Sequence, residues 1–114
     1  MGQYHKVYNV DKKQYINPHE INNGLKLLEQ VGHEHSTSTA LFMLLANSNN
    51  RGGGDFKDHC LIGTWSGDRI VVQGDYAEPK DRGYIDPKEL ETYSNISEFI
   101  NNMLDVGLGR YENA

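Results

Sequence analysis

A hydroxyl-rich stretch, a glycine-rich loop and two arginines are the residues with the clearest capacity to bind a ligand. Ser36-Thr37-Ser38-Thr39 precedes an apolar run, which predicts a helix start whose free backbone N–H groups attract phosphate or carboxylate. The glycines of Arg51-Gly52-Gly53-Gly54-Asp55 let further backbone donors approach an anion closely. Arg51 and Arg69 add permanently charged, two-pronged donors. Together these residues predict an anion-binding site.

The glycine-rich loop differs from the two well-known phosphate-binding sequences. Residues 51–55 form neither Gly-x-x-x-x-Gly-Lys-Ser/Thr nor Gly-x-Gly-x-x-Gly. A helix cap beside a surface loop explains the same residues without a ligand, so that alternative stays open.

Aromatic residues offer a second type of ligand contact. Trp65, Tyr76 and Tyr84 lie in or near a predicted hairpin, where their rings could stack on a base or pack across the strands as core. Strand register decides between these alternatives. The candidate ligand-binding residues are Ser38, Thr39, Arg51, Gly52, Gly53, Gly54, Asp55, Trp65 and Arg69.

Histidines and aspartates raise the alternative of a metal-dependent hydrolase. His33-Glu34-His35 has metal-binding side chains but lacks the i, i+4 spacing of zinc proteases. A solvated loop between two helices is the favoured explanation, because one short motif does not supply the convergent ligands of a metal site. Aspartates near predicted turns could bind magnesium or transfer protons, although aspartate is also an ordinary turn residue. Asp68 and Asp75 are the first of these to test. No metal ligand is assigned from the sequence.

Cys60 is the only cysteine, so the chain cannot form an internal disulfide. This indicates a reducing compartment, and we expect a cytoplasmic protein. His59 beside Cys60 could indicate a thiolate nucleophile, but neighbouring residues of a strand point to opposite faces and cannot readily act as a pair. We therefore predict that Cys60 fills the core. Ser66 does not lie in a Gly-x-Ser-x-Gly nucleophile elbow.

The first half of the chain predicts a hairpin followed by two helices. Residues 4–10 and 14–16 are rich in β-formers on either side of a polar turn. After Pro18, the apolar residues Ile21, Leu25 and Leu28 have helical spacing. A buried helix is expected from about 38 to 47, before a polar loop that begins at Asn47.

The second half predicts another hairpin and a final helix. Strand-like residues 60–65 and 69–73 flank a Ser-Gly-Asp turn, and Asp86-Pro87 can begin a short helical turn. Asn95 and Glu98 resemble a capping box at the start of a helix that ends near Gly107. Its predicted apolar stripe consists of Ile96, Phe99, Ile100, Met103 and Leu104. We therefore expect an α+β fold with a mainly antiparallel sheet from two β-hairpins and helices packed on one face.

Length and charge limit the classes of function. With 114 residues, the chain corresponds to a single domain, residues 1–114. A net charge of -5, with both signs interspersed, argues against general nucleic-acid binding. The start of the chain, Met1 to Val10, lacks the features of a secretory signal. The longest apolar run, Ala40 to Ala46, is far shorter than the roughly 20 residues of a membrane span.

Five short motifs resemble a family of small uncharacterised bacterial, archaeal and phage proteins. They are Met1-Gly2-Gln3-Tyr4, Asn9-Val10-Asp11-Lys12-Lys13, Leu25-Lys26-Leu27, Arg51-Gly52-Gly53-Gly54-Asp55 and Trp65-Ser66-Gly67-Asp68-Arg69. The resemblance spans most of the chain and implies a compact autonomous domain. It implies no catalytic residue, because the family has no secure activity.

The sequence favours a noncatalytic module that binds a small anionic or nucleotide-like ligand. A metal-dependent hydrolase and a protein-interaction domain are the two alternatives. Self-association is also expected, because a small domain with strand edges encloses a ligand poorly by itself.

Overall fold

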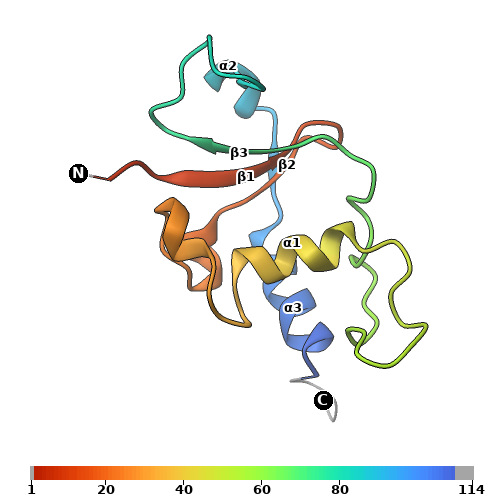
Figure 1. The fold of residues 1–114 in the computed structure, drawn as a ribbon. Coiled ribbons are helices and arrows are strands. Elements are labelled where there is room, and N and C mark those ends of the chain that lie inside the picture. Colours follow the sequence, from red (N-terminus) through yellow and green to blue (C-terminus); the bar gives the residue numbers. More distant parts are fainter. Residues whose placement is uncertain (1, 110–114) are drawn as a thin grey trace.

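A mixed four-stranded sheet and three α-helices make up the computed structural model, which describes residues 2–109 (Figure 1). In chain order the elements are β1 (His5–Asn9), β2 (Gln14–Ile16), the 3₁₀ turns η1 (Pro18–Ile21) and η2 (Leu27–Gln30), α1 (Thr37–Leu45), β3 (Ile70–Gly74), α2 (Pro87–Leu90), β4 (Ser94–Asn95) and α3 (Ser97–Gly107). The strand order is β3-β1-β2-β4. The predicted α+β class is confirmed. Met1, from the first motif of the resemblance, lies outside the described residues.

The N-terminal hairpin is confirmed, and it forms the centre of the sheet. β1 and β2 pair antiparallel, with Val7 opposite Ile16 and Tyr8 opposite Tyr15. β3 pairs antiparallel with the other edge of β1, whereas β4 pairs parallel with β2. The sheet is therefore mixed, and the prediction of a sheet built from two hairpins is wrong.

The second predicted hairpin fails because residues 60–65 pair with a helix end instead of a strand. The backbone N–H groups of Gly63 and Trp65 each donate over 3.0 Å, to the carbonyls of Met43 and Leu44 respectively. The last carbonyls of an α-helix have no donors within the helix, so this segment satisfies the end of α1. Gly63 has a φ of 86°, and a Cβ there would lie 2.7 Å from the carbonyl oxygen of Ala46. Only a glycine permits so close an approach.

The helix predicted at 38–47 is confirmed as α1, and its start is capped by a serine side chain. Ser36 Oγ accepts the backbone N–H of Thr39 at 3.3 Å. Leu44 is fully buried, but Phe42 is 73% exposed. The prediction that this helix is buried is therefore correct for only one of its faces.

The final helix, α3, ends at Gly107 as predicted, but its start and its stripe differ in detail. Asn95 Oδ1 accepts the backbone N–H of Ser97 at 2.9 Å, whereas Ile96 is the residue that precedes the helix. Phe99 is 56% exposed, so its predicted burial is wrong. At about 100° per residue, Phe99 lies roughly a quarter turn from the centre of the buried stripe.

The helix predicted after Pro18 is wrong, because the chain turns away after η1. Asn22 adopts a left-handed φ of 64°, and its backbone N–H donates to the Pro18 carbonyl. Asn23 Oδ1 then accepts from the backbone N–H and the hydroxyl of Thr37, at 2.7 and 2.8 Å. These bonds join the turn to the start of α1. Leu28 lies in η2 and is 83% exposed.

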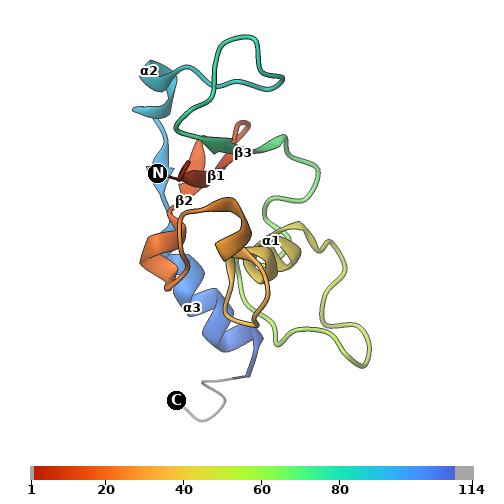
Figure 2. The same cartoon turned by 60° about the vertical axis from the view of Figure 1, so that its left-hand side comes forward.

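The two faces of the sheet have different coverings. α1 and α3 lie on one side, here named the inner face, and α2 lies on the opposite side, the outer face (Figures 1 and 2). The prediction of helices on one face therefore holds for α1 and α3 but not for α2. The fully buried core includes Ile16, Ile21, Met43, Leu44, Trp65, Ile100, Met103 and Leu104. Within residues 2–109, no helix is long and apolar enough to cross a membrane.

Candidate functional site

The residues of the predicted anion site are spread over separate parts of the molecule. At the start of α1, Ser38 Oγ lies 2.9 Å from Ser36 Oγ, and Thr39 Oγ1 donates to the His33 carbonyl. These hydroxyl groups are therefore already bonded within their own segment.

The glycine-rich loop follows the opposite end of α1 and is exposed. Asp55 Oδ2 accepts the backbone N–H groups of Arg51 and Gly52 at 2.8 and 3.1 Å, and these bonds lower the pKa of Asp55. Ser38 and Thr39 lie in the first turn of α1, whereas the loop follows the last turn of this nine-residue helix, which is roughly 13 Å long. The structure does not bring the two groups together, and a binding role for Gly52, Gly53 and Gly54 stays a prediction.

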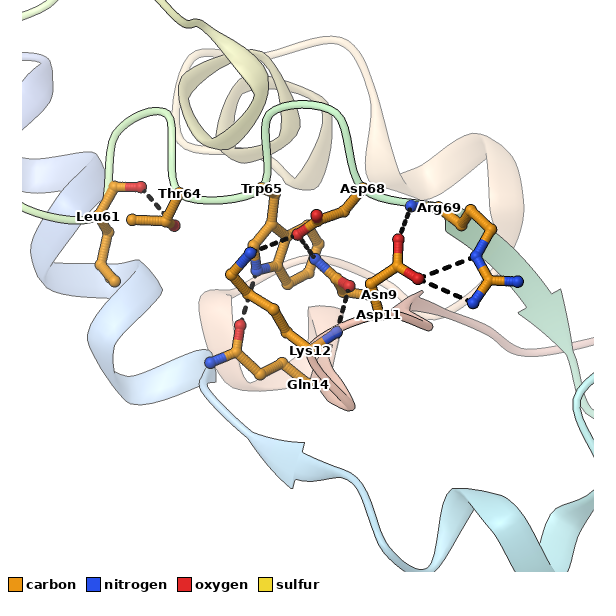
Figure 3. Close-up of polar contacts among 9 residues, drawn as sticks. All are labelled: Asn9, Asp11, Lys12, Gln14, Leu61, Thr64, Trp65, Asp68 and Arg69. Atoms are coloured by element: carbon orange, nitrogen blue, oxygen red, sulfur yellow. Dashed lines mark hydrogen bonds and ion pairs between the residues drawn. The ribbon is translucent and has the colours of Figure 1, made fainter.

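Trp65 and Arg69 are both engaged with the N-terminal hairpin (Figure 3). Trp65 is fully buried in the core, and its indole N–H donates to Gln14 Oε1 at 2.7 Å. Arg69 contacts Asp11 Oδ1 through Nε and Nη2 at 2.9 and 2.8 Å, while its backbone N–H donates to Asp11 Oδ2. The bonds from Arg69 lower the pKa of Asp11. Within residues 2–109, both side chains thus bond to the hairpin, and neither bonds to the glycine-rich loop.

A second polar contact ties the same two segments together beside Arg69 (Figure 3). Asp68 Oδ2 accepts from Asn9 Nδ2 at 2.9 Å and from Lys12 Nζ at 2.6 Å, and both bonds lower its pKa. Asn9 is fully buried. We name Asn9, Asp11, Lys12, Asp68 and Arg69 the turn clamp. It links two of the motifs that carry the family resemblance.

Histidines and carboxylates are dispersed. Among residues 2–109, no group of three or more His, Cys, Asp or Glu side chains is placed to hold a metal ion. His35 Nε2 lies 3.5 Å from Asp105 Oδ1, while His33 Nε2 lies 3.3 Å from Asn23 Nδ2. Asp75 Oδ1 accepts the backbone N–H of Tyr4 at 3.0 Å. This contact ties the residue after β3 to the residue before β1, so the carboxylate serves the fold.

Cys60 is exposed, so its predicted place in the core is wrong. The reason is that residues 60–65 form turns, not a strand. Cys60 Sγ lies 4.0 Å from His59 Nδ1, and His59 Nε2 lies 2.7 Å from Asn102 Oδ1. His59 Nδ1 also accepts the Leu61 backbone N–H at 3.1 Å, so its lone pair is already used.

The outer face of the sheet carries a candidate site that the sequence did not predict. Side chains alternate between the faces of a strand, so Lys6 and Tyr8 lie on the face opposite Val7 and Asn9. Tyr15 lies across from Tyr8 on β2. These side chains form the floor of an open hollow beneath α2.

Two adjoining hollows make up this site. The larger has a volume of about 380 Å³ and the smaller about 360 Å³, and Lys6, Tyr8, Pro87 and Leu90 line both. The larger hollow is also bordered by Tyr4, Gln73, Asp75 and Tyr84, and the smaller one by Tyr15, Glu91 and Tyr93. We name the two hollows together the tyrosine groove.

The rings on the groove floor are packed against one another. The Tyr8 ring centroid lies 5.8 Å from that of Tyr15 and 6.0 Å from that of Tyr93, the latter pair edge-on at 77°. Both separations are favourable for aromatic pairs. Lys6 Nζ lies 5.6 Å from the Tyr15 centroid, within the range of a cation–π contact. Burial, and then the neighbouring Tyr15, raise the pKa of Tyr8 above its usual value.

Most tyrosine hydroxyls of the groove are unpaired within the described chain. Tyr93 donates its hydroxyl to Glu89 Oε2 at 3.2 Å, and its pKa is raised by burial and then by this bond. No hydrogen bond to another of residues 2–109 is made by the hydroxyls of Tyr4, Tyr8, Tyr15 and Tyr84. These hydroxyls can therefore donate to or accept from a ligand.

One side chain anchors the segment that borders the groove. Gln73 Nε2 donates to the Ile85 carbonyl at 2.9 Å, and Gln73 Oε1 accepts the Ile85 N–H at 2.8 Å. Ile85 is only 4% exposed. Between β3 and α2 the chain forms a long loop (Figure 1), and these bonds hold the end of that loop against the sheet.

The sequence contains a signal for part of this groove. Tyr4, Lys6 and Tyr8 alternate along β1, a pattern that predicts one shared face. Tyr84, a predicted stacking residue, lines the larger hollow, whereas Tyr76 lies outside both hollows and is 60% exposed. Residues 84–93 are held by the Gln73–Ile85 bonds at one end and by the pairing of β4 with β2 at the other, and neither contact has a local sequence pattern.

No family model, curated protein or solved structure matches the chain. The family resemblance therefore stays an expectation.

Proposed function

We propose that the protein is a noncatalytic module that binds a small, planar, nucleotide-like ligand in the tyrosine groove. One observation carries the proposal: five tyrosines surround Lys6 in two adjoining hollows on one face of the sheet. Either hollow is large enough for a small molecule, since ligand sites typically have volumes of about 300–1,000 Å³.

The chemistry of the lining supports a planar ligand. Stacking on an aromatic side chain is worth about 1–3 kcal/mol per base. The unpaired hydroxyls can supply directional hydrogen bonds to the edge of the ring. The groove also borders the segment that two hydrogen bonds from Gln73 hold against the outer face.

The hydrolase alternative has no comparable support. Asp68 and Asp75, the first carboxylates to test, are bonded to the fold through Asn9, Lys12 and the Tyr4 backbone. A protein-interaction role becomes the better hypothesis if small molecules fail to bind.

Two accompanying proposals concern the cellular compartment and the oligomeric state of the protein. We propose a cytoplasmic setting, since the exposed Cys60 thiol is preserved best under reducing conditions. We also propose self-association through the free edge of β3, where Val72 is 41% exposed. A monomeric mass at every micromolar concentration would contradict self-association.

A thermal-shift screen with nucleosides, nucleotides and divalent metals, followed by calorimetry, tests the ligand proposal. A compound that binds the folded state raises the melting temperature. Tyr8→Ala should weaken the binding of a hit by about 5- to 100-fold, because a stacking surface is lost. Tyr76→Ala, which changes a tyrosine outside the groove, should leave the affinity unchanged.

The same experiment separates the groove from the glycine-rich loop. Loss of binding in Arg51→Ala, with normal binding in Tyr8→Ala, would assign the ligand to the loop instead. Stabilisation by metals alone would favour the hydrolase hypothesis. Failure of every planar compound to bind would contradict the proposed function.

A further inference from the structure

Lys6 is the only basic residue among the described side chains that line the tyrosine groove. It lies between Tyr4 and Tyr8 on the outer face and borders both hollows. Its ammonium group lies over the Tyr15 ring and forms no ion pair with a carboxylate of residues 2–109. Lys12, by contrast, lies 2.6 Å from Asp68 Oδ2. The charge of Lys6 is therefore available to a ligand.

Each hollow also contains a carboxylate. Asp75 borders the larger hollow, where its Oδ1 atom accepts the Tyr4 N–H at 3.0 Å, and Glu91 borders the smaller. A ligand with several negative charges would place the additional ones beside Asp75 or Glu91. Juxtaposed like charges oppose binding, so the groove offers one favourable position for an anion and two unfavourable ones.

We infer that the tyrosine groove selects a planar ligand with a single negative charge, which pairs with Lys6. This inference rests on the proposed function and adds the charge class of the ligand. The aromatic rings bind the planar part, the Lys6 ammonium binds one carboxylate or phosphodiester group, and the two acids disfavour polyphosphates. Partial burial beside the rings strengthens the ion pair relative to one in bulk water.

Two matched ligand series test this inference by calorimetry. Adenosine, cyclic adenosine monophosphate and adenosine triphosphate share one base and carry no, one and several negative charges. Indole and indole-3-acetate form a second pair, in which the anion is a carboxylate. In a series whose ring binds, the singly charged member should bind about 10- to 100-fold tighter than the neutral one. The triphosphate should bind more weakly than the cyclic monophosphate.

Charge-removing variants assign the preference to its residues. Lys6→Met keeps an apolar stem of similar length but removes the charge, so it should bring the affinities for the singly charged and neutral members of each series together. Lys88→Met removes an exposed lysine that lines neither hollow, and should keep the preference. Asp75→Asn retains an oxygen for the Tyr4 N–H and should improve triphosphate binding severalfold. Unchanged melting curves establish that each variant is folded.

The outcomes separate the inferred charge preference from the proposed binding of a planar ring. Equal affinity for neutral and singly charged members, or a preference that survives Lys6→Met, would overturn the inference and leave ring binding in the groove intact. A triphosphate that binds tightest would also overturn it. If no member of either series binds, the proposed function fails together with the inference.

Discussion

Val7 and Tyr8 are neighbours on β1, yet their side chains lie in opposite surroundings. Val7 is 1% exposed and packs with the aliphatic core beneath α1 and α3. Tyr8 faces the tyrosine groove, where it contacts Tyr15 and Tyr93 through ring edges and faces. The strand thus divides its side chains between a closed core and an open hollow.

This difference separates stability from recognition. The inner face buries mainly apolar side chains in a closed core, so the loss of a large one leaves a cavity. The outer face holds amphipathic rings and hydroxyls that the fold does not use. Substitutions on the two faces should therefore affect different properties of the protein.

The largest effect is expected for Trp65→Ala on the inner side. Loss of this fully buried ring and of its bond to Gln14 should reduce the free energy of unfolding by about 3–5 kcal/mol. Tyr4→Ala on the outer side, where the ring is 50% exposed, should cost less than about 1 kcal/mol. Urea unfolding monitored by circular dichroism measures both. Similar costs would refute the division between the faces.

A second pair of substitutions sharpens the comparison within the helices. Leu44→Ala should cost about 2–5 kcal/mol because Leu44 is fully buried. Phe99→Ala should cost less than about 1 kcal/mol, because Phe99 is largely exposed. Denaturation midpoints decide the matter, and a large loss in Phe99→Ala would show that this ring is covered in solution.

Acid should destabilise the protein through the turn clamp. The folded-state pKa values of Asp11 and Asp68 are lowered by hydrogen bonds, first from Arg69 and Asn9 respectively. The two carboxylates stabilise the folded protein above their unfolded-state pKa of about 3.9. This contribution is lost as the pH falls through their lower folded-state pKa values. Urea midpoints at pH 7 and pH 3 should therefore differ less in an Asp11→Asn/Asp68→Asn variant than in wild type. An equal difference would assign the acid sensitivity elsewhere.

The smallest effect on stability is expected for Tyr8→Phe. The ring contacts remain, and the lost hydroxyl has no partner among residues 2–109, so the free energy of unfolding should change by less than about 0.5 kcal/mol. If this hydroxyl bonds a ligand, the affinity falls severalfold while stability is maintained. A large loss of stability would reveal that the hydroxyl serves the fold.

Elements with strong local patterns were predictable from the sequence. The β-formers around the first turn, Ser36 before an apolar run, and Asp86 before Pro87 indicated the hairpin, α1 and α2. Each depends on neighbours within a few residues. Gly107 likewise marked the end of α3.

Features that depend on distant partners were not predictable in the same way. Residues 60–65 have strand-like composition, but their backbone donors bind the carbonyl end of α1. The predicted ligand residues separate because Arg69 pairs with Asp11 and Trp65 enters the core. The groove needs the Tyr8–Tyr15 register together with the Gln73–Ile85 bonds, and these arise only in the folded chain.

The burial of Trp65 has an optical consequence. It is the only tryptophan in the chain, so the intrinsic indole fluorescence comes from one site in the core. Its emission should shift to longer wavelength when unfolding exposes the ring to water. A ligand in the tyrosine groove lies on the other face of the sheet and has no direct contact with the indole. The protein therefore carries a natural reporter of its core that is separate from the proposed binding surface.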